Sequence, residues 1–213
     1  MRFLRNDMEK MTFVLCSSNK NKIREFRQIL SEKAGELLGE DAPQIEILSL
    51  YDIGFSDEIV EDGATFEENA MIKAAAVSSI TQYPCIADDS GLCVRALGGE
   101  PGIYSARYAG EHGNDAENIK KLLSKLEGVE DRDGYFVSSV AYAFGNERFT
   151  VRGEAHGKIL YEPIGNGGFG YDPVFECSVY HKSYAELTAD EKNGVSHRRR
   201  AIEALADRLF KNK

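Results

Sequence analysis

Short runs of apolar residues alternate along this chain with longer segments in which apolar residues recur every three or four positions. The run from Thr12 to Cys16 is continuous and predicts a buried strand. A helix is expected from about Lys20, because apolar residues then follow at helical spacing. Those residues are Ile23, Phe26, Ile29 and Leu30. This alternation restricts the chain to a fold that packs strands and helices on one another.

Further strands and helices are expected on the same grounds. Thr65 and Glu68 form a capping-box pattern, which opens a helix that runs to about Ile80. The other expected elements are a strand over Ile45–Leu50, a short strand over Cys85–Ala87, a helix beginning at Asn114 or Asp115, a strand pair over Tyr135–Phe144 and Arg148–Ala155 turned at Gly145-Asn146, and a last helix from near Ser196.

The mixture of a hairpin with alternating strands and helices predicts an α/β or α+β fold with a mixed sheet flanked by helices. A chain of 213 residues is long enough for one domain with a substantial core. We expect residues 1–11 to be a flexible extension and residues 12–213 to form a single domain, since no linker divides them. We expect the sheet to be elongated and the glycine-rich loops to mark a cleft between two lobes.

Charge and cysteine content narrow the possible partners and the compartment. The net charge of −9 disfavours nucleic-acid binding, which needs a basic face, but it permits a small anionic ligand. We expect no membrane span and no secretory signal, because apolar runs are short and Met1–Asp7 has no apolar core. The four cysteines lack zinc-site spacing, and Cys16 and Cys85 lie in apolar runs. A reducing compartment is therefore expected, and we predict a cytoplasmic location.

The segment from Ser17 to Lys22 joins the first buried strand to the first helix. Amides at a helix N-terminus favour an anion, the small hydroxyl residues permit close approach, and Lys20 or Lys22 adds charge. A phosphate site is one interpretation. The other is a capped helix start with solvated lysines. The segment has no Walker A pattern.

Two acidic segments are candidates for binding a metal ion. Asp88-Asp89-Ser90-Gly91 follows a short buried strand, and neighbouring side chains in extended backbone point to opposite faces. One aspartate is therefore expected to face a site, although an aspartate-rich turn is equally compatible. The acidic run from Asp57 to Asp62 contains Glu61 and precedes a helix, where acids are favourable in any case. It becomes a metal-site candidate only if it faces Asp89.

The segment from Gly165 to Pro173 matches G-x-G-x-x-G, but it does not have the context of a dinucleotide-binding loop. No clear strand precedes it, and Pro173 stands where a helix would begin. Two interpretations remain open: a mobile loop, or backbone packed close to a flat ligand with Phe169 available to stack on it.

The last helix begins with basic residues at Ser196–Arg200, although cations at a helix N-terminus oppose the helix dipole. Helical spacing places Arg198 on the stripe that faces the protein, Arg199 near it, and Arg200 on the opposite face. We therefore expect Arg198 to lie in a pocket. A solvated basic run that balances the acidic surface is the alternative.

Taken together, these segments resemble the inosine triphosphate pyrophosphatase family of non-standard purine NTPases. The matching segments, in the family's order, are Phe13–Asn19 with Lys22 and Glu25, Thr65–Ala70 with Lys73, Ala87–Leu92, Leu97–Gly99, Pro101–Tyr108, Gly168–Phe175, Ala185–Leu187, Lys192 and Ser196–Arg198. Two departures bear on substrate preference: Ser17-Ser18 stands where the family often has Thr-Gly, and Arg199 stands where a glycine is common.

The resemblance implies hydrolysis of ITP, dITP or XTP to the monophosphate and pyrophosphate with Mg2+, by a homodimer of two-lobed subunits. It implies that Glu61 and Asp89 hold the metal and that Asp89 takes a proton from the attacking water, with Asp88 or Glu58 as possible sharers of that work. The implied substrate-binding residues are Ser17, Ser18, Asn19 and Lys22 for the phosphates, and Ser90, Phe169, Gly170, Tyr171, Asp172, Lys192, His197 and Arg198 elsewhere.

Selection of the base can be argued from hydrogen-bond donors. Hypoxanthine and xanthine carry an oxygen at C6, where adenine carries an amino group. Arg198 and a suitably protonated His197 are donors, so they pair with the oxygen and meet adenine with an unfavourable donor–donor contact. A site of this kind can reject an analogue strongly.

Overall fold

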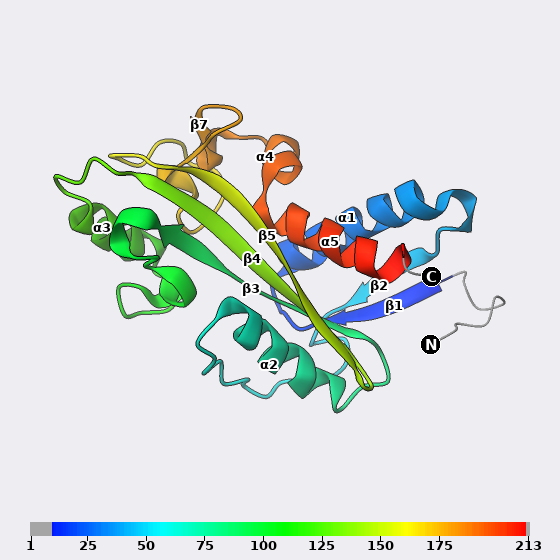
Figure 1. The fold of residues 1–213 in the computed structure, drawn as a ribbon. Helices are drawn as coiled ribbons and strands as arrows, with labels where there is room; N and C mark the ends of the chain where they lie inside the picture. Colours follow the sequence, from blue (N-terminus) through cyan, green and yellow to red (C-terminus); the bar gives the residue numbers. More distant parts are fainter. Residues whose placement is uncertain (1–9, 212–213) are drawn as a thin grey trace. The chain divides into compact units, whose positions relative to one another are not determined.

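The computed structural model describes residues 10–211 of this protein, and Figure 1 shows the course of the chain. The chain divides into two compact units. The first unit contains the residues up to 89, residues 139–152 and the residues from 199 onward. The second unit contains residues 90–138 and 153–198. Buried apolar clusters lie within each unit.

Seven strands within residues 10–211 form one mixed sheet. They are β1 (Lys10–Leu15), β2 (Gln44–Leu48), β3 (Cys85–Val94), β4 (Asp133–Phe144), β5 (Glu147–Ile159), β6 (Phe175–Cys177) and β7 (Lys182–Ser183), hydrogen-bonded in the order β2-β1-β3-β4-β5-β6-β7. β1 pairs in parallel with β2 and β3, whereas β6 pairs antiparallel with β5 and β7. The predicted mixed α/β fold is thereby confirmed.

Helices flank this sheet, with short 3-10 turns between them. The α-helices are α1 (Lys20–Leu38), α2 (Phe66–Ser78), α3 (Asp115–Lys125), α4 (Ala189–Val195) and α5 (His197–Phe210). The 3-10 turns are Gly39–Asp41, Arg95–Leu97, Gly102–Arg107, Asp172–Val174 and Tyr184–Glu186. Among the helices of residues 10–211, none combines the length and apolar character needed to cross a membrane.

The first unit buries both faces of its strands. Alternate residues of a strand face opposite sides, so Phe13 and Val14 enter different clusters. Phe13 packs with residues of α1 and α5, including Phe26 and Ile202. Val14 packs with the alanine-rich α2, for example Ala70. Figure 1 shows α1 and α5 on one side of β1 and β2, and α2 on the other.

The second unit has a core built around aromatic rings. Phe136 of β4 lies between Phe175, at a ring-centroid distance of 4.7 Å, and Tyr184, at 5.8 Å. Leu122 of α3 and Leu92 of β3 belong to the same buried cluster. This core carries the loop and the helix start that contain the predicted base-binding residues.

Two expected boundaries and one expected hydrogen bond differ from the structure. β3 continues through Asp88 and Asp89 to Val94, so the two aspartates lie inside a strand and not at its end. β1 begins at Lys10, which pairs with Gln44, so Lys10 and Met11 do not belong to an extension; residues 1–9 lie outside the described residues. Glu68 accepts a hydrogen bond from the amide of Ala64 at 2.6 Å, which replaces the reciprocal half of the predicted capping box.

Helix α4 is the one α-helix among residues 10–211 that the sequence pattern did not predict; the short strands β6 and β7 were not predicted either. Thr188 and Glu191 form a reciprocal capping box at its start. None of its seven residues is buried, so the helix has no apolar stripe. Apolar periodicity supports the predictions of α1, α3 and α5, and α4 does not carry it.

Candidate functional site

A group of polar side chains surrounds Asp89 in the first unit, and we call it the Asp89 cluster: Asp89, Glu61, Asn69 and Lys73. Asn69 and Lys73 lie one turn apart on α2 and therefore share a face. Asn69 donates a hydrogen bond to Asp89 Oδ2 at 3.2 Å. Lys73 Nζ lies 2.6 Å from Glu61 Oε2 and 3.8 Å from Asp89 Oδ1, so it bridges the two carboxylates.

The pKa of Asp89 lies above the ordinary value for an aspartate. Burial of the carboxyl group is the largest cause, the Lys73 ammonium opposes it, and the Glu61 carboxylate adds to it. A carboxylate with a raised pKa holds a proton more readily, which is the property expected of a general base.

Asp88 faces away from the Asp89 cluster. Its side chain is 1% exposed and accepts a hydrogen bond from Lys22 Nζ of α1 at 2.9 Å. The predicted alternation is therefore confirmed: Asp88 meets α1 and Asp89 meets α2. The ion pair with Asp88 therefore fixes the Lys22 ammonium near the start of α1.

The segment Ser17-Ser18-Asn19 forms a capped helix start. Asn19 is the N-cap of α1, and its Oδ1 accepts hydrogen bonds from the amides of Asn21 at 2.9 Å and Lys22 at 3.2 Å. Ser17 Oγ accepts from the amide of Asn19 at 3.1 Å, and Ser18 is exposed. The oxygen atoms of Ser17 and Asn19 thus satisfy the backbone, so hydrogen bonds to a phosphate would have to come from donor atoms.

The glycine-rich loop of the second unit, residues 165–172, presents Phe169 at its tip. Phe169 is 48% exposed, and Lys192 Nζ lies 4.7 Å from the centre of its ring. Lys192 also forms an ion pair with the buried Asp172. Asp172 Oδ2 accepts a hydrogen bond from the amide of Phe169 at 2.8 Å. The loop therefore presents an exposed aromatic ring, that of Phe169, with the Lys192 ammonium beside it.

The loop is hydrogen-bonded to the rest of the second unit at several points. Gly167 donates its amide hydrogen to the carbonyl of Ala185 at 3.0 Å. The Tyr171 hydroxyl donates to the carbonyl of Ser105 at 2.9 Å, and its ring is buried in the core. Tyr171 is therefore a core residue, and its part in substrate binding stays a prediction.

His197 and Arg198 are both buried at the start of α5. The imidazole of His197 stacks on Phe136 with ring centroids 5.0 Å apart. Arg198 is 6% exposed, and its Nη2 donates to Ser90 Oγ at 3.4 Å. Arg200 is exposed. The predicted inward position of Arg198 and outward position of Arg200 are therefore confirmed, and Ser90 is the residue directly after Asp89 in the chain.

Arg199 has a structural partner in the first unit. Its Nη1 lies 3.2 Å from Glu32 of α1 and its Nε 3.0 Å from Glu203, one turn later in α5. Pairs of this kind at the surface contribute little to stability. Arg199 therefore links two helices and does not extend the set of base-binding donors.

The Asp89 cluster meets the requirements of Mg2+ although it holds few carboxylates. Among residues 10–211, no group of three or more His, Cys, Asp or Glu side chains is arranged to hold a metal ion. Mg2+ is commonly held by one or two carboxylates and takes its remaining oxygens from water and phosphate. Glu61 and Asp89 converge on the same cation, Lys73, so their oxygens fit such an ion when phosphate is present.

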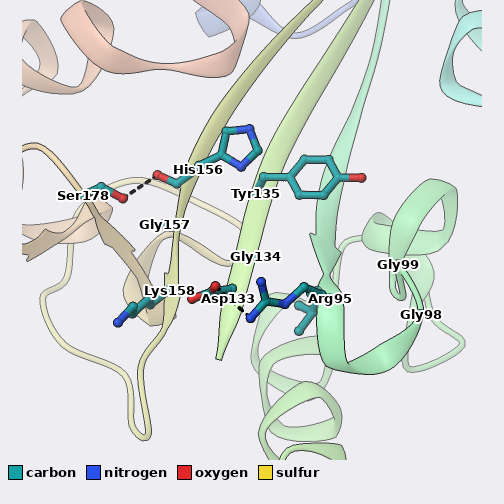
Figure 2. Close-up of a pocket in the computed structure, with 11 residues that line it drawn as sticks. Arg95, Gly98, Gly99, Asp133, Gly134, Tyr135, His156, Gly157, Lys158 and Ser178 are labelled. Atoms are coloured by element: carbon teal, nitrogen blue, oxygen red, sulfur yellow. Dashed lines mark hydrogen bonds and ion pairs between the residues drawn. The ribbon is translucent and has the colours of Figure 1, made fainter. Parts of the chain in front are cut away.

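A hollow of about 670 Å3 in the second unit contains none of the predicted site residues. Figure 2 shows Tyr135, His156 and Arg95 at its lining. The Arg95 guanidinium is paired with Asp131 at 2.7 Å and Asp133 at 3.0 Å, so its charge is already neutralised. Its lining contains no residue of the Asp89 cluster, and we do not assign the reaction to it.

Lys73 and Asn69 are the site residues that the sequence predictions missed. Both residues belong to a segment that resembles the family, but the sequence alone assigns neither of them a role. Their spacing of one helical turn next to the acidic run was the available signal, because it places a donor and a cation on one face. Only the pairing of strands and helices shows that this face meets Asp89.

The seven-stranded sheet and its helices place this protein in the class of mixed α/β proteins. Its candidate site features are the Asp89 cluster and the loop in which Lys192 lies beside the Phe169 ring. Comparisons with known proteins identify its family. The sequence profile of the Ham1 family matches residues 13–208, and the chain belongs to that family. A dITP/XTP pyrophosphatase of Bacillus licheniformis is 47% identical over 196 residues, which cover 91% of this chain and 95% of that protein. A dITP/XTP pyrophosphatase of Bacillus subtilis is 45% identical over 199 residues, which cover 92% and 96%.

Solved structures agree with this assignment. The Ham1 protein of Staphylococcus aureus matches with a TM-score of 0.83 and 38% identity, covering 95% of this chain and 100% of that chain. A HAM1 protein from Coxiella burnetii matches with a TM-score of 0.81 and 37% identity, covering 94% and 99%. Sequence and structure comparisons together confirm the resemblance that the motifs indicated.

Proposed function

We propose that this protein hydrolyses non-standard purine nucleoside triphosphates, namely dITP, ITP and XTP, to the monophosphate and pyrophosphate. The relatives from Bacillus licheniformis and Bacillus subtilis are named dITP/XTP pyrophosphatase, and the match covers 95% and 96% of their lengths. The observation that supports the reaction best is the partly buried Asp89 with its raised pKa, beside Glu61 and Lys73. Such a reaction removes nucleotides that would otherwise contaminate the nucleotide pool.

We propose Mg2+ as the cofactor, held by Glu61 and Asp89. A bound Mg2+ would neutralise phosphate oxygens and the charge that develops on the departing pyrophosphate. The acidic chain, of net charge −9, otherwise repels a polyphosphate. Lys73 already lies between the two carboxylates, so its ammonium supplies part of the same neutralisation.

The residues of the first unit would handle the phosphates and the water. Asp89 accepts the proton of the attacking water, because partial burial raises the pKa of its carboxyl group above the ordinary aspartate value. Lys22, held by Asp88, and the donor groups of Ser17, Ser18 and Asn19 bind phosphate oxygens at the start of α1.

The residues of the second unit would recognise the base. Arg198 and His197 donate hydrogen bonds toward the C6 oxygen, and adenine presents an amino group there. Phe169 stacks on the ring, while Asp172 and Lys192 form a polar rim beside it. Gly170 shapes the loop, and Ser90 lies within reach of Arg198 and directly after Asp89 in the chain.

We also propose that the protein is a cytoplasmic homodimer. The dimer rests on the family resemblance, and the location on the four cysteines, which lie within the described residues, are buried and carry no disulfide. Size-exclusion chromatography with light scattering is expected to give about twice the chain mass of 23.7 kDa. A mass equal to that of one chain would contradict the dimer.

The function is tested by product analysis with ITP, dITP, XTP, GTP and ATP in Mg2+. We expect the first three to be hydrolysed fastest, with one pyrophosphate released per monophosphate and no orthophosphate unless a separate inorganic pyrophosphatase is added. Orthophosphate as the primary product, or binding of ITP without turnover, would contradict the proposal.

A further inference from the structure

Two consecutive amides of the glycine-rich loop are held by carboxylates from different parts of the second unit. The amide of Phe169 donates to Asp172 Oδ2 at 2.8 Å. The amide of Gly170 donates to Asp115 Oδ2 at 2.7 Å, although Asp115 lies 55 positions earlier in the chain. Hydrogen bonds to charged acceptors are shorter and stronger than neutral ones. The peptide that carries the Phe169 ring is thereby fixed on both sides.

Asp115 is well placed to hold the loop without contributing to the core. It is the first residue of α3, and its side chain is exposed. The helix start is capped separately by Asn114, which accepts from the amide of Glu117. α3 itself is anchored by Asn118, whose side chain binds the backbone at Ala109 and Ala106. Loss of the Asp115 carboxylate therefore leaves the helix cap and its anchor in place.

We propose that Asp115 is a positioning residue for the base, acting through the Gly170 amide on the orientation of Phe169. This inference rests on the proposed function, because Phe169 is the residue assigned to stack on the purine. In this scheme the Asp115 carboxylate contacts neither the phosphates of the substrate nor the attacking water. Its removal therefore weakens substrate binding and leaves the rate of the chemical step unchanged.

The test compares Asp115→Ala, Asp115→Asn and Glu117→Ala by steady-state hydrolysis of ITP in Mg2+. A charge-assisted hydrogen bond is worth enough to expect a rise in KM of about tenfold for Asp115→Ala, with kcat within about twofold. Asp115→Asn keeps an acceptor oxygen and should restore KM to within about threefold of the original protein. Glu117→Ala removes an acid from the same helix turn and should change neither constant.

A second measurement reports on the loop directly. Hydrogen–deuterium exchange over residues 165–172 is expected to become faster in Asp115→Ala, and to remain unchanged in Glu117→Ala. An unchanged KM and unchanged exchange in Asp115→Ala would overturn the inference. So would an equal rise in KM for the Asn and Ala variants, since that would assign the effect to charge alone.

The failure of this inference is distinguishable from failure of the proposed function. If the unmodified protein releases no pyrophosphate from ITP, the function is wrong. If it does, and Asp115→Ala keeps the original KM, only the positioning role is wrong.

Discussion

At the residue scale, burial and neighbouring charges determine the character of Asp89. Burial raises its pKa, and the Glu61 carboxylate raises it further, while the Lys73 ammonium limits the rise. The hydrogen bond from Asn69 orients the carboxylate at the same time. One aspartate is therefore both more basic than usual and fixed in direction, as general-base catalysis requires.

Replacement of this carboxylate should abolish most of the activity. We expect Asp89→Asn to lower kcat for ITP by about 100-fold or more, because an amide cannot accept the proton of water and binds Mg2+ poorly. The measurement is steady-state pyrophosphate release, with circular dichroism as a check of the fold. Asp57→Asn, an exposed acid at the start of the preceding acidic run, serves as the control and should retain full turnover. Near-normal turnover by Asp89→Asn would remove Asp89 from the mechanism.

The sequence could predict the directions of these side chains but not their partners. Strand alternation separated Asp88 from Asp89, and helical spacing separated Arg198 from Arg200, because both depend only on local geometry. That Asp88 meets Lys22, and Asp89 meets Lys73, depends on which helix covers which face of β3. No local period encodes that choice.

At the element scale, the glycine-rich loop has a backbone that a side chain would disturb. Gly168 has a φ of +74°, and a Cβ there would lie 2.0 Å from Asp172 Oδ2. Gly170 has a similar φ of +60°, but a Cβ there would meet nothing within 4 Å. A residue with a side chain would therefore be strained by the backbone conformation at either position. Only at position 168 would its Cβ also collide with Asp172.

This difference gives a matched pair of variants. We expect Gly168→Ala to raise KM for ITP by about tenfold, since Asp172 must move away from Lys192 and the Phe169 amide. Gly170→Ala carries only the strain and should raise KM by less than about threefold. Equal effects of the two substitutions would show that the contact with Asp172 does not shape the site.

Helices with an apolar stripe were predictable, and the alanine-rich α2 was predictable from its capping-box pattern. α1 buries Phe26, Ile29 and Leu30 as its spacing indicated. α4 has no buried residue, and its capping box alone was too weak a signal. The apolar run of β3 ends at Ala87, before the two aspartates, and the strand was expected to end there; Lys22 and Lys73 provide partners that let it continue.

At the scale of the whole molecule, the acidic protein and its anionic substrate repel each other. We expect removal of Mg2+ with EDTA to stop pyrophosphate release, and added Mg2+ to restore it, while circular dichroism shows an unchanged fold. The fold should persist because the buried cores of both units contain no metal ligand among the described residues. Turnover of ITP in excess EDTA would contradict the role of the ion.

Family membership could be predicted from the sequence, whereas the strand order could not. The motifs occur in one order over most of the chain, and a chance match of several ordered segments is far rarer than a match of one. The order β2-β1-β3-β4-β5-β6-β7 places β3 beside β1 across long stretches of intervening sequence. Such long-range pairing leaves no signal in local periodicity.

The central claim is that Arg198 reads the base of the nucleotide that Asp89 hydrolyses. The most direct measurement is the ratio of kcat/KM for ITP to that for ATP in the unmodified protein and in Arg198→Ala, Arg200→Ala and Asp89→Asn. We expect Arg198→Ala to lower this ratio by roughly tenfold or more, because the donor–acceptor match to the C6 oxygen is lost. Arg200→Ala should leave it unchanged, and Asp89→Asn should lower both substrates equally. Equal losses on ITP and ATP in Arg198→Ala would contradict the claim.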